Sequence, residues 1–130
     1  MTTSQTPAAA PTIKNPGVKP AVNRKLFVNV PVENVQRSID FFEALGFTFN
    51  AQFTAADSTA MLVGEDAYFM LLTRKRFGDL VTRPIADPTA AVGATFALGL
   101  ESREAVDAMV NKAVELGAVQ AHDPEDEGFM

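Results

Sequence analysis

The sequence contains no cysteine and no tryptophan, and it has a single histidine among its 130 residues. Without cysteine the chain can form neither disulfides nor thiolate metal sites, so redox chemistry says nothing about its compartment. One histidine cannot supply a site of two histidines and one carboxylate. That residue, His122, stands in an acidic stretch, which favours a solvated loop over a weak chelating site.

Long apolar runs and an excess of positive charge are also missing. No run approaches the roughly 20 residues of a membrane span, and residues 1–22 lack the apolar core of a secretion signal. The formal net charge of −5 argues against nucleic acid and anionic membranes as partners, because both require a cationic surface. We therefore expect a cytoplasmic protein that binds neither nucleic acid nor membrane.

The first 22 residues differ in composition from the rest of the chain. They are rich in alanine, proline and threonine and poor in large apolar side chains, so burial cannot offset the entropy lost on ordering. We predict a disordered tail over 1–22, the alternative being an arm that packs on a partner subunit. Residues 23–130 then form one domain.

The first half of this domain shows strand and helix patterns in alternation. Apolar residues alternate over 24–30, with Leu26, Val28 and Val30 on one face and Phe27 and Asn29 on the other. A helix is expected over 35–45, because a capping residue precedes it and a glycine follows it. Three further strands are expected over 47–53, 59–63 and 67–72, the last two joined by a turn at 64–66.

A similar plan restarts after a long connection over 74–93, in which one helical turn is expected around Phe77, Leu80 and Val81. A strand is expected over 95–100, a helix after Ser102, and a short strand over 118–121. Both helices end in Leu-Gly, at 45–46 and at 116–117. Matching starts and stops favour a tandem repeat over chance similarity between two amphipathic units. Module one would span 24–73 and module two 94–130.

The first half also resembles a known superfamily. The run Val32-Glu33-Asn34-Val35-Gln36-Arg37-Ser38-Ile39-Asp40-Phe41-Phe42, followed by Leu45-Gly46-Phe47, is similar to the opening of glyoxalases, bleomycin-resistance proteins and extradiol dioxygenases. Asn34 replaces the usual aspartate and can still cap a helix. Within the superfamily the chain most resembles small bacterial predicted lactoylglutathione lyases.

The resemblance implies an α+β fold in which tandem βαβββ modules form an open mixed-sheet barrel around a cleft. Phe27 and Asn29 would face that cleft, and so would Thr95. Family members continue with a further hairpin, so we expect a second module that is truncated at the C-terminus. They also commonly dimerise, which makes a homodimer the expected assembly.

The resemblance also locates where the metal enzymes of this superfamily hold their ion. Those positions fall on Phe27, near Leu71, on Thr95, and beyond Met130. Neither a phenylalanine nor a leucine coordinates a cation, and a threonine hydroxyl is a poor ligand for zinc or iron. We therefore expect no metal and no cofactor.

Two further groups of residues are candidates for recognising a ligand. Arg74 begins a locally basic stretch that would serve as an anion-binding lip or simply be a solvated loop. Aromatic residues would line a pocket, or each would belong to the core. The candidate ligand-binding residues are Phe27, Asn29, Phe69, Leu71, Thr95 and Arg74.

Three functions remain open from the sequence. The first is metal-independent binding of a small molecule in the cleft, with Asn29 and Thr95 as polar orienting groups. The second is a lyase or dioxygenase whose metal ligands lie partly in a further C-terminal segment. The third is a dimeric structural or regulatory subunit without a ligand. The fold alone does not choose among them, because function depends on the site.

Overall fold

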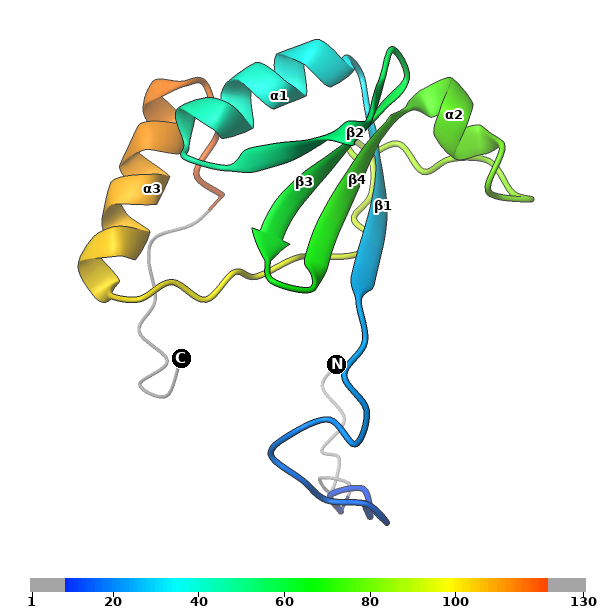
Figure 1. Cartoon of the computed structure of the whole chain (residues 1–130), viewed down its shortest axis with the longest axis vertical. Helices are drawn as coiled ribbons and strands as arrows, with labels where there is room; N and C mark the ends of the chain where they lie inside the picture. The colour runs from blue at the N-terminus through cyan, green and yellow to red at the C-terminus, as the bar shows by residue number, and fades with distance from the viewer. Residues whose placement is uncertain (1–8, 122–130) are drawn as a thin grey trace, which may run out of the picture.

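The computed structural model describes residues 9–121, which contain one sheet and three helices (Figure 1). His122 and the remaining residues of the acidic stretch lie outside this range, as do residues 1–8. None of the helices within 9–121 is long and apolar enough to cross a membrane. In chain order the elements are β1 (Leu26–Val32), α1 (Val35–Ala44), β2 (Thr48–Ala55), β3 (Ser58–Gly64), β4 (Ala67–Thr73), α2 (Arg74–Gly78) and α3 (Arg103–Glu115).

The four strands form a mixed sheet in the order β1-β4-β3-β2. β1 and β4 run parallel, whereas the β4–β3 and β3–β2 pairs are antiparallel. The parallel pair requires a crossover, which α1 begins, and the antiparallel pairs need only short turns. This arrangement is the predicted βαβββ module in an α+β fold, and the sheet is open.

The pairing register assigns every side chain of the central strands to one of two faces. Phe27 and Asn29 lie opposite Tyr68 and Met70, and so share one side of the sheet. Ala60 and Leu62 on β3 and Leu72 on β4 belong to the same side, which we call the open face. The other side, the helix face, carries Leu26, Val28, Val30, Met61, Phe69 and Leu71.

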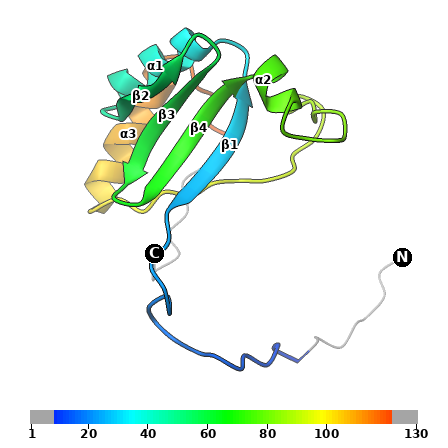
Figure 2. The ribbon, with the colours of Figure 1, turned by 45° about the vertical axis from the view of Figure 1, so that its right-hand side comes forward.

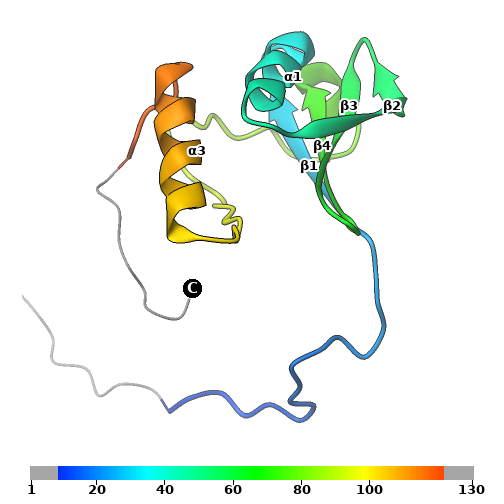
Figure 3. The same ribbon diagram turned by 60° about the vertical axis from the view of Figure 1, so that its left-hand side comes forward.

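α1 and α3 lie on one side of the sheet (Figures 2 and 3). The ring of Phe96, in the segment that leads to α3, contacts the ring of Phe69 at 5.1 Å between centroids. This contact identifies the covered side as the helix face. The opposite side is covered by neither α1 nor α3, and α2 contacts β1 and β4 where these strands end.

The core is small and centres on β3 and β4. Met61 is 1% exposed and Leu71 is 3% exposed, and Val35 from the first turn of α1 is also buried. Thr59 is buried as well, and its hydroxyl lies 2.9 Å from that of Thr54. This hydrogen bond satisfies a polar group that would otherwise destabilise the core.

β2 departs from the alternation expected over 47–53. Its register with β3 shifts between Asn50 and Ala55. Asn50 causes part of this irregularity, because its side chain accepts a hydrogen bond from the amide of Gln52 and its carbonyl accepts one from the hydroxyl of Thr54. Phe53 lies within this irregular stretch and is 53% exposed.

The helical turn in the connection begins earlier than expected. α2 starts at Arg74 because the hydroxyl of Thr73 accepts a hydrogen bond from the amide of Arg76 at 3.1 Å. Phe77 is inside this helix, but Leu80 and Val81 follow it. The prediction centred on the apolar residues and missed the threonine cap.

The strand predicted over 95–100 is wrong for the described part of the chain. Residues 91–100 are neither strand nor helix, and none of them pairs with β1, β2, β3 or β4. The same holds for 118–121. Alternating side chains favour a strand only when a neighbouring backbone pairs with it, and within residues 9–121 this segment pairs with neither edge strand, β1 or β2. The extent of module two over 94–130 stays a prediction.

Candidate functional site

The open face changes from buried to exposed along the strands. At one end Ala60 and Leu72 are buried, with exposures of 0% and 4%. At the other end Phe27 is 49% exposed and Leu62 is 36% exposed. Apolar side chains that remain accessible beside a closed core are typical of a surface that binds another molecule.

Phe27 and Tyr68 are in direct contact on this face. Their ring centroids are 5.0 Å apart and their planes differ by 11°, so the rings are stacked. The Tyr68 hydroxyl makes one long hydrogen bond, 3.5 Å to the carbonyl oxygen of Glu65 in the β3–β4 turn. Asn29 follows two residues after Phe27 on the same face and is exposed, and its amide can both donate and accept.

The structure does not bring all the predicted ligand-binding residues together. Phe69 and Leu71 lie on the helix face, one residue out of phase with Phe27 and Asn29. Leu71 is buried, and the ring of Phe69 contacts Phe96. Because successive strand residues point to opposite faces, the β4 residues that accompany Phe27 and Asn29 are Tyr68 and Met70.

Thr95 is also separated from Phe27 and Asn29. It lines a small hollow of about 320 Å³ between the 95–98 segment and the β1–β4 pair. Most of the other lining residues are apolar, and Val28 and Phe69 among them belong to the helix face. This hollow lies where the two halves of the chain meet.

A larger hollow of about 610 Å³ lies between α1 and the end of α3. Arg37, Asp40 and Phe41 line it from α1, and Leu116 to Ala118 line it from the other side. It therefore also opens on the helix side of the molecule. It reflects loose packing of α3 against α1 more than a shaped site.

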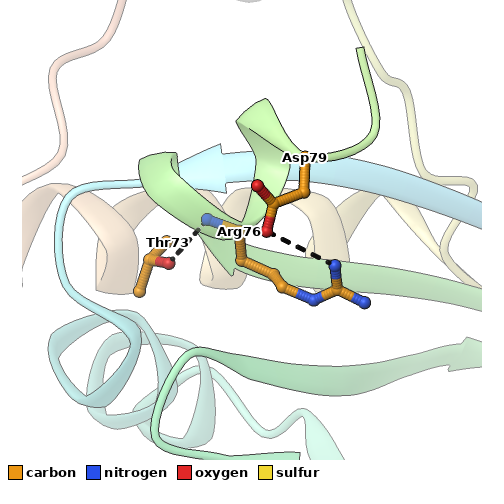
Figure 4. Close-up of polar contacts among 3 residues, drawn as sticks. All are labelled: Thr73, Arg76 and Asp79. Carbon is orange, nitrogen blue, oxygen red and sulfur yellow. Dashed lines mark hydrogen bonds and ion pairs between the residues drawn. The ribbon is translucent and has the colours of Figure 1, made fainter.

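The basic stretch at α2 is partly neutralised by its own acidic neighbours. Arg76 lies 3.8 Å from Asp79, as an exposed ion pair within one helical turn (Figure 4). The hydroxyl and amide of Thr89 donate to the Asp87 carboxylate and hold its pKa below the ordinary value, and the charge of Arg74 adds to this effect. Arg74 would therefore meet an anion with a carboxylate already nearby.

The positions at which the superfamily resemblance implies metal ligands do not fit an ion here. On β1 and β4 the open face carries Phe27, Asn29, Tyr68 and Met70. None of these side chains is an imidazole or a carboxylate. Within residues 9–121 no three histidine, cysteine, aspartate or glutamate side chains are grouped so that they could hold a metal ion. The chemistry of this face is apolar contact and amide hydrogen bonding.

Tyr68 and Met70 are the site residues that sequence reasoning did not select as a pair. The strand assignment contained the signal, since residues of β4 that lie level with Phe27 and Asn29 must share their face. Only the register decides which two residues those are, and a shift of one residue selects Phe69 and Leu71 instead.

Comparison with known proteins agrees with this architecture. Residues 24–64 match the family model described as bleomycin resistance protein-like N-terminal. A solved structure, that of the hypothetical protein SA1046 from S. aureus, aligns with a TM-score of 0.65 and 23% sequence identity, over 82% of this chain and 77% of that one. At this identity the alignment shows the fold alone. No curated protein matches the chain.

Proposed function

We propose that this chain, whose residues 24–64 match the bleomycin resistance protein-like N-terminal family model, binds a small molecule on the open face without a metal ion. One observation carries the proposal. The pairing register groups Phe27, Asn29, Tyr68 and Met70 on an accessible face, and this set recognises apolar surface and one polar group but coordinates no divalent ion.

The amide of Asn29 is the polar group on which orientation of the ligand would depend. It is exposed, and its neighbours on the open face are apolar or aromatic. A single well-placed hydrogen bond beside apolar surface contributes about 0.5–1.5 kcal/mol to binding. Arg74 and Thr95 stay candidates that lie away from Phe27 and Asn29, as do Phe69 and Leu71.

The test is a thermal-shift screen of the full chain against a small-molecule panel, run with and without a chelator. We expect saturable binders that the chelator leaves unchanged, with NMR shifts in β1 and β4. Asn29→Leu should lower the affinity for these compounds about two- to tenfold. Asn111→Leu is the matched control, because Asn111 is an exposed asparagine on α3.

The same samples test the enzyme alternative. About one tightly held transition-metal ion per chain by elemental mass spectrometry, together with binding that the chelator abolishes, would reject the metal-independent proposal. It would instead favour a metal-dependent lyase or dioxygenase.

We also propose that the chain forms a homodimer. Val106, Val110 and Val114 form a stripe along α3 and are 37–44% exposed, and a second copy would cover such apolar surface. Light scattering of the full chain should give twice the monomer mass. A monomer at high micromolar concentration would contradict this, as would a dimer unaffected by Val110→Glu. The cytoplasmic location stays a prediction.

A further inference from the structure

The stacked rings of Phe27 and Tyr68 follow the direction in which the strands pair. The two residues are register partners on β1 and β4, and paired strands lie about 4.8 Å apart. The centroid separation of 5.0 Å matches that spacing. Two coplanar rings placed side by side could not approach so closely without overlapping, so these rings stack face against face across the two strands.

The stack is open at the β1 end. β1 is the edge strand of the sheet, with β4 as its neighbour. One face of the Phe27 ring is therefore used by Tyr68, and on the side away from Tyr68 no strand of residues 9–121 pairs with β1. The 49% exposure of Phe27 agrees with this geometry. On the inner side the next residue across the sheet is Leu62, the register partner of Tyr68.

We propose that the ligand of the open face is a planar aromatic compound whose ring extends the Phe27–Tyr68 stack on the free side of Phe27. This inference rests on the proposed function and names the class of ligand. Aromatic rings attract one another in offset stacks beyond the simple burial of area. A saturated ring of the same size would gain the burial but lose the stacking.

Asn29 adds a requirement for a polar substituent. It stands two residues from Phe27 on the same face, which is roughly 6–7 Å along an extended strand. A hydroxyl or carbonyl on the ligand at that distance from the stacked ring would reach its amide. A neutral ligand suits this face better than an anion, since the open-face side chains carry no charge and the chain has a net charge of −5.

The experiment compares 2-naphthol with decahydro-2-naphthol, a neutral pair that differs in planarity and aromaticity. Affinities for the full chain are measured by calorimetry. Tyr68 is the only tyrosine, so a sample with isotope-labelled tyrosine gives one set of ring signals from the proposed site. We expect 2-naphthol to bind about three- to tenfold more tightly than the saturated alcohol, and to shift the Tyr68 ring signals through its ring current.

Three variants separate stacking from general apolar contact. Phe27→Leu should lower the 2-naphthol affinity about three- to tenfold and remove the preference over the saturated alcohol. Phe27→Tyr keeps a ring at the position and should retain that preference. Phe53→Leu is the matched control, since Phe53 is 53% exposed on β2, and it should leave both affinities unchanged. Amide NMR spectra check that each variant is folded.

Several outcomes would overturn the inference. The first is an equal affinity of the chain for the two alcohols. The second is an equal loss of affinity in Phe27→Leu and Phe53→Leu. The third is the absence of saturable 2-naphthol binding to the folded chain. If Asn29→Leu lowers the affinity of the saturated alcohol, or of a non-aromatic compound from the panel, the proposed function stands and the aromatic class of ligand is rejected. If no compound binds the open face, both fail together.

Discussion

The helices α1 and α3 begin and end in the same way but are packed differently. Asn34 and Ser102 cap them by accepting hydrogen bonds from the amides of Arg37 and Ala105, at 2.9 Å and 3.0 Å. α1, however, lies against β2 and β4, whereas the valine stripe on α3 stays more than a third exposed. The boundaries of each helix are thus set by its own capping residues, whereas its burial depends on which elements pack against it.

The C-terminal ends of α1 and α3 are also alike. Gly46 has φ +99° and Gly117 has φ +111°. After each helix, the glycine amide donates to the carbonyl three residues back and the next amide to the carbonyl five back, at 2.9–3.0 Å. This is the Schellman pattern, which needs a left-handed residue. Two independent ends of the same form strengthen the case for an internal repeat.

The largest expected difference between the two regions is in core truncation. Met61→Ala should lower the free energy of unfolding by about 2–5 kcal/mol, because it leaves a cavity in the closed part of the sheet. Val110→Ala on α3 should cost less than about 1 kcal/mol when measured at a protein concentration too low for the proposed dimer, since Val110 is already 37% exposed in the single chain. Urea denaturation measures both. Similar losses at that concentration would mean that α3 is packed against the rest of its own chain.

Substitution of the two helix-ending glycines should give a smaller contrast. Alanine at position 46 or 117 meets no atom within 4 Å, so any cost comes from the left-handed backbone, at about 1–2 kcal/mol. Gly46→Ala should lower global stability by this amount, and Gly117→Ala should only fray the end of α3 in hydrogen exchange. Gly99→Ala is the control, since Gly99 has no positive φ. An unchanged unfolding midpoint for Gly46→Ala would contradict the assignment.

Removal of the caps should have a still smaller effect. Asn34→Ala should lower the free energy of unfolding by about 1 kcal/mol, as loss of an N-cap usually does. Ser102→Ala removes the equivalent bond from a helix that contributes little to the core. We expect its effect to appear as faster amide exchange over 103–106, with global stability unchanged. A matching global loss for both would show that the halves unfold as one unit.

The smallest effect concerns the turn at Asp87, between the two regions. Its folded pKa lies below the ordinary 3.8 because Thr89 donates twice to the carboxylate, with a further contribution from Arg74. The turn is therefore stabilised above pH 3.8, and this is lost as the pH falls through the lowered folded pKa. Carbon NMR titration should show the low pKa in the wild type. Thr89→Val should move it upward and Thr82→Val should not; equal titrations would refute the hydrogen-bond cause.

Sequence patterns predicted most of module one and little of the site. Alternation and capping residues located β1, α1, β3 and β4 to within about two residues, since both signals depend on local backbone chemistry. They could not locate the shift in β2, which depends on the hydrogen bonds of Asn50. They also could not choose between Met70 and Leu71 as the residue beside Asn29, because that choice is a matter of register.

By itself the sequence determined where helices start and stop, which residues alternate, and that histidine and cysteine chemistry is scarce, because these properties reside in single residues and their near neighbours. Tertiary structure alone decided that Phe27 stacks on Tyr68, that Phe69 lies on the helix face, and that residues 95–100 pair with no strand in the described part of the chain. Each of these depends on which backbone lies beside which, and a strand pattern cannot specify its own partner.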